Sequence, residues 1–287
     1  MSPDGVEHDP GLVFVNVVVT DPYGRVVTGL SKDAFSISED KHPLNVSYFS
    51  DEEVPQSVCV VFDVSGSMIA KANVAGDAVV RFALRANSSN QYFIVGFDGQ
   101  VHPADDWVRG EKDLVAGLNG LGHISPKKYG TALYDAVAAG VEKVSRGPQP
   151  RQILIVITDG RDTNSKVKVS RLRDMIRQSA VTVYVIDIVA DTDFMAFEQG
   201  RTTLDGLAAI SGGGAYFPKT KAELNDAFER IRLELHGTYT LGVKPEGAAD
   251  GKLHKIDVKV RPPETFPRLS ARSREGYYAP SSGEKNE

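Results

Sequence analysis

The chain has little cysteine and no long apolar run. Cys59 is the single cysteine among 287 residues, so it has no partner for an intrachain disulfide and says little about the redox compartment. No segment approaches the roughly 20 consecutive apolar residues of a membrane span, and residues 1–5 lack the charged-then-apolar profile of a signal peptide. We therefore expect either a cytosolic protein or a leader that lies outside this chain.

The chain also lacks a strong excess of charge of one sign. It has 33 lysines and arginines against 38 aspartates and glutamates, a net charge of −5. This mild acidic excess argues against a general binder of nucleic acid or of anionic membranes. Hydrophobic residues at 41% and charged residues at 25% are close to the globular average, which excludes wholesale disorder, collagen-like repeats and coiled coil.

Both ends of the chain have the pattern of antiparallel strands. Residues 13–18 read as a short strand, and apolar and polar residues alternate in residues 35–38 and 46–49. Residues 239–243 and 256–260 have the same alternating character. Each end offers only three or four strands, which is marginal for an independent fold. We therefore expect the two ends to pair with each other in one β-sandwich-like domain.

The middle of the chain alternates short apolar runs with amphipathic helices. Continuous apolar runs at residues 58–62, 153–157 and 183–186 predict strands buried on both faces of a parallel sheet. Residues 97–100 predict a hairpin turn that adds an antiparallel edge strand, and residues 117–122 predict a helix stop and a loop. The predicted fold class is α/β, a doubly wound, mostly parallel, Rossmann-like sheet inserted into the β-sandwich-like domain.

Four segments follow from this prediction. They are residues 1–54 as the N-terminal half of the β-sandwich-like domain, 55–237 as the α/β domain, 238–280 as the C-terminal half, and 281–287 as a disordered tail.

Polar residues gather where the predicted strands end, which is where open α/β sheets form their sites. The first central strand ends in Asp63, Ser65 and Ser67 as D-x-S-x-S, Thr131 precedes a predicted helix, and Asp159 follows another strand. Each residue alone has a simpler explanation as a helix cap or turn residue. Together they supply two carboxylates, three hydroxyls and no soft ligand, which is the donor set of a hard cation such as Mg²⁺.

At these five residues the chain resembles the von Willebrand factor type A (VWA) domain family. The metal-ion-dependent adhesion site (MIDAS) of that family consists of D-x-S-x-S, a separate Thr and a separate Asp, and the resemblance covers about residues 55–236. Residues 13–49 and the closing run Arg272-Ser273-Arg274-Glu275-Gly276-Tyr277-Tyr278-Ala279-Pro280 resemble VWA-related proteins of acidobacterial type. The latter are commonly exported, so the resemblance implies a full-length form that is periplasmic, on the cell surface or secreted.

The resemblance implies a non-enzymatic, adhesion-type module that binds protein through Mg²⁺, with Mn²⁺ or Ca²⁺ as alternatives. An Asp or Glu of a partner protein would complete the coordination of the metal, and self-association through the same site is a further option. The neighbours expected around the metal or facing its ligand are Gly66, Gly130, Gly160, Asp135, Asp162, Lys127, Lys128 and Arg161. The three basic residues among them would steer an acidic partner, or would simply be solvated loop charges.

Two alternatives remain open at the level of sequence. A Mg²⁺-dependent hydrolase of the phosphoryl-transfer type would use a strand-end Asp as nucleophile, but it would need a second Asp where this chain has Ser65. A structural subunit would use the metal only to hold three loops together.

Overall fold

The computed structural model describes residues 11–122, 130–159, 161–188, 194–245, 250–262 and 268–279, and only the backbone of residues 194–199. The chain divides into two compact units. One unit comprises residues 54–209 and 214–232, and the other comprises residues 1–53, 210–213 and 233–287. The domain boundaries expected at residues 54 and 237 stay predictions, and the expected disordered tail, residues 281–287, lies outside the described residues.

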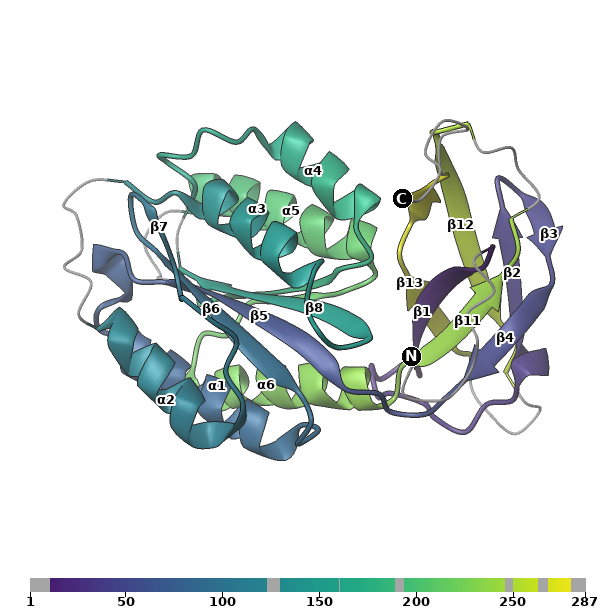
Figure 1. Cartoon of the computed structure of the whole chain (residues 1–287), viewed down its shortest axis with the longest axis horizontal. Helices are drawn as coiled ribbons and strands as arrows, with labels where there is room; N and C mark the ends of the chain where they lie inside the picture. The colour runs from purple at the N-terminus through teal and green to yellow at the C-terminus, as the bar shows by residue number, and fades with distance from the viewer. Residues whose placement is uncertain are drawn as a thin grey trace. The chain divides into compact units, whose positions relative to one another are not determined.

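A six-stranded sheet in the order β10-β9-β8-β5-β6-β7 forms the centre of the first unit (Figure 1). Neighbouring strands are parallel except β6 and β7, which form the predicted antiparallel hairpin at one edge. Every residue of β5 and β6 is buried, including Cys59, because this part of the sheet is covered on both faces. The strands are β5 (Gln56–Asp63), β6 (Gln91–Phe97), β7 (Val101–Pro103), β8 (Arg151–Thr158), β9 (Thr182–Asp187) and β10 (Ala215–Tyr216).

Helices cover both faces of this sheet, which confirms the doubly wound α/β prediction. Figure 1 shows α3, α4 and α5 on one face and α1, α2 and α6 on the other. The helices are α1 (Ala72–Arg85), α2 (Gly110–Leu121), α3 (Leu133–Val144), α4 (Val169–Gln178), α5 (Phe194–Ser211) and α6 (Lys221–His236). Within the described residues, none of these helices combines the length and the apolarity that crossing a membrane requires.

The glycines of α2 correct one prediction. The helix stop and loop expected at residues 117–122 are wrong for most of that stretch, because α2 continues to Leu121. Gly117 lets this helix lie close to β6: a Cβ atom at that position would lie 2.6 Å from Ile94 Cδ1. The glycine therefore serves close packing of helix on sheet rather than helix termination.

Two four-stranded antiparallel sheets form the second unit, in the orders β13-β1-β11-β4 and β14-β12-β2-β3. Each sheet contains strands from both ends of the chain, so the expected β-sandwich-like host domain is confirmed. Val15, Leu241 and Ile37 belong to one buried cluster that draws residues from both sheets. The strands are β1 (Val13–Thr20), β2 (Phe35–Glu39), β3 (His42–Leu44), β4 (Val46–Ser50), β11 (Tyr239–Val243), β12 (Leu253–Val260), β13 (Ser270–Ser273) and β14 (Gly276–Tyr278).

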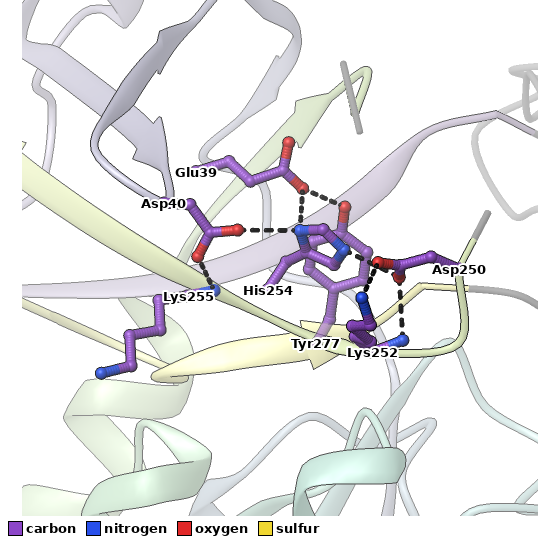
Figure 2. A network of polar contacts seen from close by, with 7 residues as sticks. All are labelled: Glu39, Asp40, Asp250, Lys252, His254, Lys255 and Tyr277. Atoms are coloured by element: carbon purple, nitrogen blue, oxygen red, sulfur yellow. Dashed lines mark hydrogen bonds and ion pairs between the residues drawn. The ribbon is translucent and has the colours of Figure 1, made fainter. Parts of the chain in front are cut away.

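A polar network joins neighbouring strands of the second of these sheets (Figure 2). His254 of β12 lies between two carboxylates, with Nδ1 2.9 Å from Asp40 Oδ2 and Nε2 3.1 Å from Asp250 Oδ1. The Tyr277 hydroxyl of β14 donates to Glu39 of β2. The hydrogen bond to Asp250, followed by the one to Asp40, raises the pKa of His254, so the imidazolium form is favoured in this network.

Candidate metal centre

Asp63 ends β5 and is fully buried. Its Oδ2 accepts a hydrogen bond of 2.6 Å from the Thr158 hydroxyl, and its Oδ1 accepts one of 2.8 Å from the Ser65 backbone N–H. Burial raises the pKa of Asp63 and the Asp159 carboxylate adds to the rise, while the Ser65 and Thr158 donors oppose it. The side chain is therefore held in one orientation at a place where its negative charge is costly.

The two serines connect Asp63 to Asp159. Ser65 Oγ lies 3.2 Å from Ser67 Oγ, and Ser67 Oγ donates a hydrogen bond of 2.7 Å to Asp159 Oδ1. The structure thus brings four of the five predicted ligands into one continuous chain of contacts. The capping explanation does not account for the serine hydroxyls, because neither the short helix η2 (Gly66–Met68) nor α1 has a side-chain cap hydrogen bond.

Thr131 lies in the loop before α3, and the N-cap of that helix is Ala132 rather than Thr131. The Thr131 N–H donates to Thr163 Oγ1 at 2.8 Å, and the Thr131 carbonyl accepts from the backbone N–H groups of Thr163 and Asn164 at 2.9 and 3.1 Å. Gly130 precedes it with φ +96°, a conformation that favours glycine. Thr131 is therefore linked to the site through the loop that follows Asp159.

The residues that were expected around the metal or its ligand lie in different environments. The Asp135 carboxylate accepts from the backbone N–H groups of Lys166 and Val167, and Asp162 Oδ1 accepts from the backbone N–H of Tyr134. Both carboxylates thus fasten the loop after β8 to the start of α3. Arg161 is exposed and Gly66 begins η2, whereas Lys127, Lys128 and Gly160 lie outside the described residues.

Two charged residues at the site were not predicted from the sequence. Lys71 Nζ lies 2.6 Å from Asp159 Oδ2 and 3.1 Å from the Ile188 carbonyl oxygen. Asp187 ends β9 and is 5% exposed; burial, and next the charge of Asp159, raise its pKa to about 6. Asp187 follows an apolar run just as Asp63 does, which is a signal that could have found it. Lys71 has no comparable signal.

The donor set fits a hard divalent cation. Among the described residues, no group of three or more His, Cys, Asp or Glu side chains is placed to hold a metal, so a cation at this site would need serine or threonine hydroxyls among its ligands. Asp63 and Asp159 supply buried carboxylates, Ser65 and Ser67 supply hydroxyls, and neither sulfur nor imidazole belongs to this group of side chains. Such an oxygen-only set suits Mg²⁺, Mn²⁺ or Ca²⁺ better than a soft metal.

Comparisons with known proteins agree with this fold. The family model described as von Willebrand factor type A domain matches residues 57–230. A structure described as von Willebrand factor type A from Catenulispora acidiphila is similar with a TM-score of 0.53 and 12% identity over 97% of this chain and 76% of that chain. No curated protein matches the chain.

Two further solved structures resemble part of the chain. The PilB minor pilin from Streptococcus sanguinis has a TM-score of 0.52 and 13% identity over 66% of this chain and 63% of the pilin. Proximal thread matrix protein 1 from the mussel byssus, described with a zinc-occupied MIDAS motif, has a TM-score of 0.52 and 14% identity over 67% of this chain and 48% of that protein. The chain therefore spans less than two thirds of either protein.

Proposed function

The chain belongs to the von Willebrand factor type A domain family, and on that premise we propose that it is a metal-dependent protein-binding module. The residues that would hold the divalent cation are Asp63, Ser65, Ser67, Thr131 and Asp159. A cation bound there would offer a coordination position to an Asp or Glu side chain of a partner protein.

The observation that carries the proposal is the continuous chain of contacts from Asp63 through Ser65 and Ser67 to Asp159. The two serine hydroxyls lie between two buried carboxylates and do not cap a helix. If hydroxyls are direct ligands and the carboxylates act through water, the inner coordination sphere carries no protein charge. The bound cation then keeps its attraction for a carboxylate from outside.

Binding is favoured over phosphoryl transfer by the residue at position 65. A nucleophilic Asp63 would need a second carboxylate two residues further on, and this position holds Ser65, whose hydroxyl contacts Ser67. Asp63 itself is fully buried and accepts hydrogen bonds on both of its oxygens. This arrangement supports a fixed metal ligand more than a nucleophile that attacks a substrate.

Partner capture with and without metal tests the proposal. The immobilised full chain is exposed to the extracytoplasmic fraction of its native cell in Mg²⁺ or in EDTA, and the retained proteins are identified by mass spectrometry. We expect a partner that Mg²⁺ retains, that EDTA releases, and that Asp63→Ala no longer captures. Isothermal titration with Mg²⁺, Mn²⁺, Ca²⁺ and Zn²⁺ measures the metal directly, with zinc included because the byssus protein holds it.

Asp174→Ala is the matched control, since Asp174 is a partly exposed carboxylate on α4 whose ion pair with Arg177 is long, at 3.5 Å. This variant should behave like the wild type in both assays. Equal capture by Asp63→Ala and wild type would defeat the adhesion role. Loss of stability without loss of capture would instead favour the structural-subunit alternative.

We also propose that the full-length protein is exported and that Arg161 helps to attract the acidic partner. Exported placement keeps an adhesion site accessible to partners outside the cytoplasm. Cell fractionation with an antibody against the chain checks the first point, and the salt dependence of partner association by Arg161→Ala checks the second.

A further inference from the structure

The ammonium group of Lys71 contacts the site at the carboxylate of Asp159. Lys71 Nζ lies 2.6 Å from Asp159 Oδ2, and Ser67 Oγ donates to the other oxygen of the same carboxylate. The Asp159 side chain is fully buried, and the Lys71 side chain is 25% exposed. The carboxylate is therefore neutralised by a cation that belongs to the chain itself.

Helix formation does not explain a lysine at this position. Lys71 is the N-cap residue of α1, and its side chain makes no cap hydrogen bond. Helix N-caps favour Ser, Thr, Asp or Asn, and a positive charge near the N-terminus is opposed by the positive end of the helix dipole. The contacts that account for the Lys71 side chain are those with Asp159 and with the Ile188 carbonyl.

The charges around the Lys71–Asp159 ion pair affect the binding of any cation that enters the site. Asp63, Asp159 and Asp187 lie close enough to influence one another, and Lys71 and Arg201 offset the negative charge felt at Asp187. Interactions between charges are strong where the carboxylates are shielded from water. A divalent cation next to Asp159 would repel the Lys71 ammonium from the same carboxylate.

We propose that Lys71 is an internal counter-cation that competes with the divalent cation for Asp159 and thereby sets the metal affinity of the site. The inference rests on the proposed function, because it requires a divalent cation among the five predicted ligands. It makes Lys71 a positioning residue rather than a metal ligand. Metal entry moves the ammonium away from Asp159 Oδ2 and exposes it.

Metal titration of charge variants tests the competition. Isothermal titration of the full chain with Mg²⁺ and Mn²⁺ compares the wild type with Lys71→Met, which removes the charge but keeps an apolar stem, and with Lys71→Arg, which keeps the charge. Removing the repelling charge should tighten metal binding roughly tenfold or more. Lys71→Arg should stay close to the wild type.

Lys168→Met is the matched control, because Lys168 is also the N-cap residue of a helix, α4, and is exposed. Its metal affinity should equal that of the wild type. Unchanged or weaker binding by Lys71→Met would overturn the inference. Circular dichroism establishes that each variant is folded, and Lys71→Gln replaces Lys71→Met if the latter does not fold.

A second readout needs no variant. Acetylation of the wild-type chain by an amine reagent, followed by mass spectrometry, measures the reactivity of Lys71 relative to Lys168 in Mg²⁺ and in EDTA. The ratio should rise severalfold with Mg²⁺, since the ammonium leaves its buried partner. An unchanged ratio at saturating metal would contradict the inference.

Asp63→Ala separates the two proposals. If the wild type binds metal, Asp63→Ala loses that binding and Lys71→Met binds as the wild type does, only the role of Lys71 fails. If neither the wild type nor Lys71→Met binds metal, the proposed function and the inference are both overturned.

Discussion

At the residue scale, Asp187 shows how a buried carboxylate at a strand end beside the proposed metal site affects stability. It ends β9 and is almost fully buried, and burial together with the nearby Asp159 charge raises its pKa from 3.8 to about 6. An acid whose pKa is higher in the folded state destabilises the fold above that pKa, because the unfolded chain releases the proton more easily. The penalty is absent below about pH 3.8, grows between pH 3.8 and 6, and is complete at pH 7.

Asp187→Asn should therefore stabilise the protein at neutral pH. We expect the free energy of unfolding in EDTA to rise by about 1–3 kcal/mol at pH 7.5 (roughly one to two pKa units of penalty removed) and to change little near pH 4. Urea denaturation at the two pH values measures the difference. Asp174→Asn, on the surface of α4, is the control and should have a small effect at either pH; equal stability of Asp187→Asn and wild type at pH 7.5 would contradict the expectation.

At the scale of elements, the loop before α3 depends on one glycine. Gly130 has φ +96°, and a Cβ atom there would lie 2.8 Å from Asn164 Cβ. Asn164 is itself fixed, since its Nδ2 donates 2.8 Å to the Gly99 carbonyl and its N–H donates to the Thr131 carbonyl. The loop that carries Thr131 is thus stacked on the loop after β8 with no room for a side chain at position 130.

Gly130→Ala should disturb both the stability of the fold and the proposed metal site. The positive φ and the close contact with Asn164 together should lower the free energy of unfolding by about 1–3 kcal/mol. Metal affinity should fall as well, because Thr131 moves with the loop. Urea denaturation and isothermal titration measure the two effects.

Gly120→Ala provides the control for this glycine. It lies in α2 with nothing within 4 Å of its Cβ position, so alanine there should be neutral or stabilising by about 0.5–1 kcal/mol. Similar behaviour of the two glycine variants would show that the conformation of Gly130 is not needed for the Thr131 loop.

At the scale of the whole molecule, the β-sandwich-like domain depends on both ends of the chain. β1 pairs with β11 and β13, β4 pairs with β11, and β2 pairs with β12. Among the described residues, the β pairings that lie within residues 1–53 are that of β2 with β3 and an isolated bridge between Thr20 and Val26. The N-terminal segment therefore lacks most of its hydrogen-bonding partners when it is alone.

A fragment of residues 1–53 should not fold. A single short hairpin is at best marginally stable in water, so the fragment should show little β structure by circular dichroism and no cooperative unfolding. The full chain measured alongside should show both. A fragment with dispersed amide signals and a cooperative thermal transition would refute the insertion of one domain into the other.

Local sequence determined the elements and the chemical type of the site. The alternation at residues 35–38 and the apolar run that ends at Asp63 depend on neighbouring residues, so the periodicity shows the strands directly. The D-x-S-x-S pattern, with Thr131 and Asp159 elsewhere, likewise indicated an oxygen-rich site because strand ends meet at one sheet edge. The helix stop predicted at Gly117 was wrong, because the role of this glycine in close packing against Ile94 is not a local property.

Tertiary structure alone decided which distant groups meet. Lys71 and Asp159 are 88 residues apart, and no local sequence pattern predicts their ion pair. The pair forms only because the start of α1 lies beside the end of β8. The register of Val13 opposite Val243 likewise requires the chain to return after the whole inserted domain. Periodicity is a property of neighbouring residues. Charge pairing and strand register depend instead on which distant segments the fold brings together.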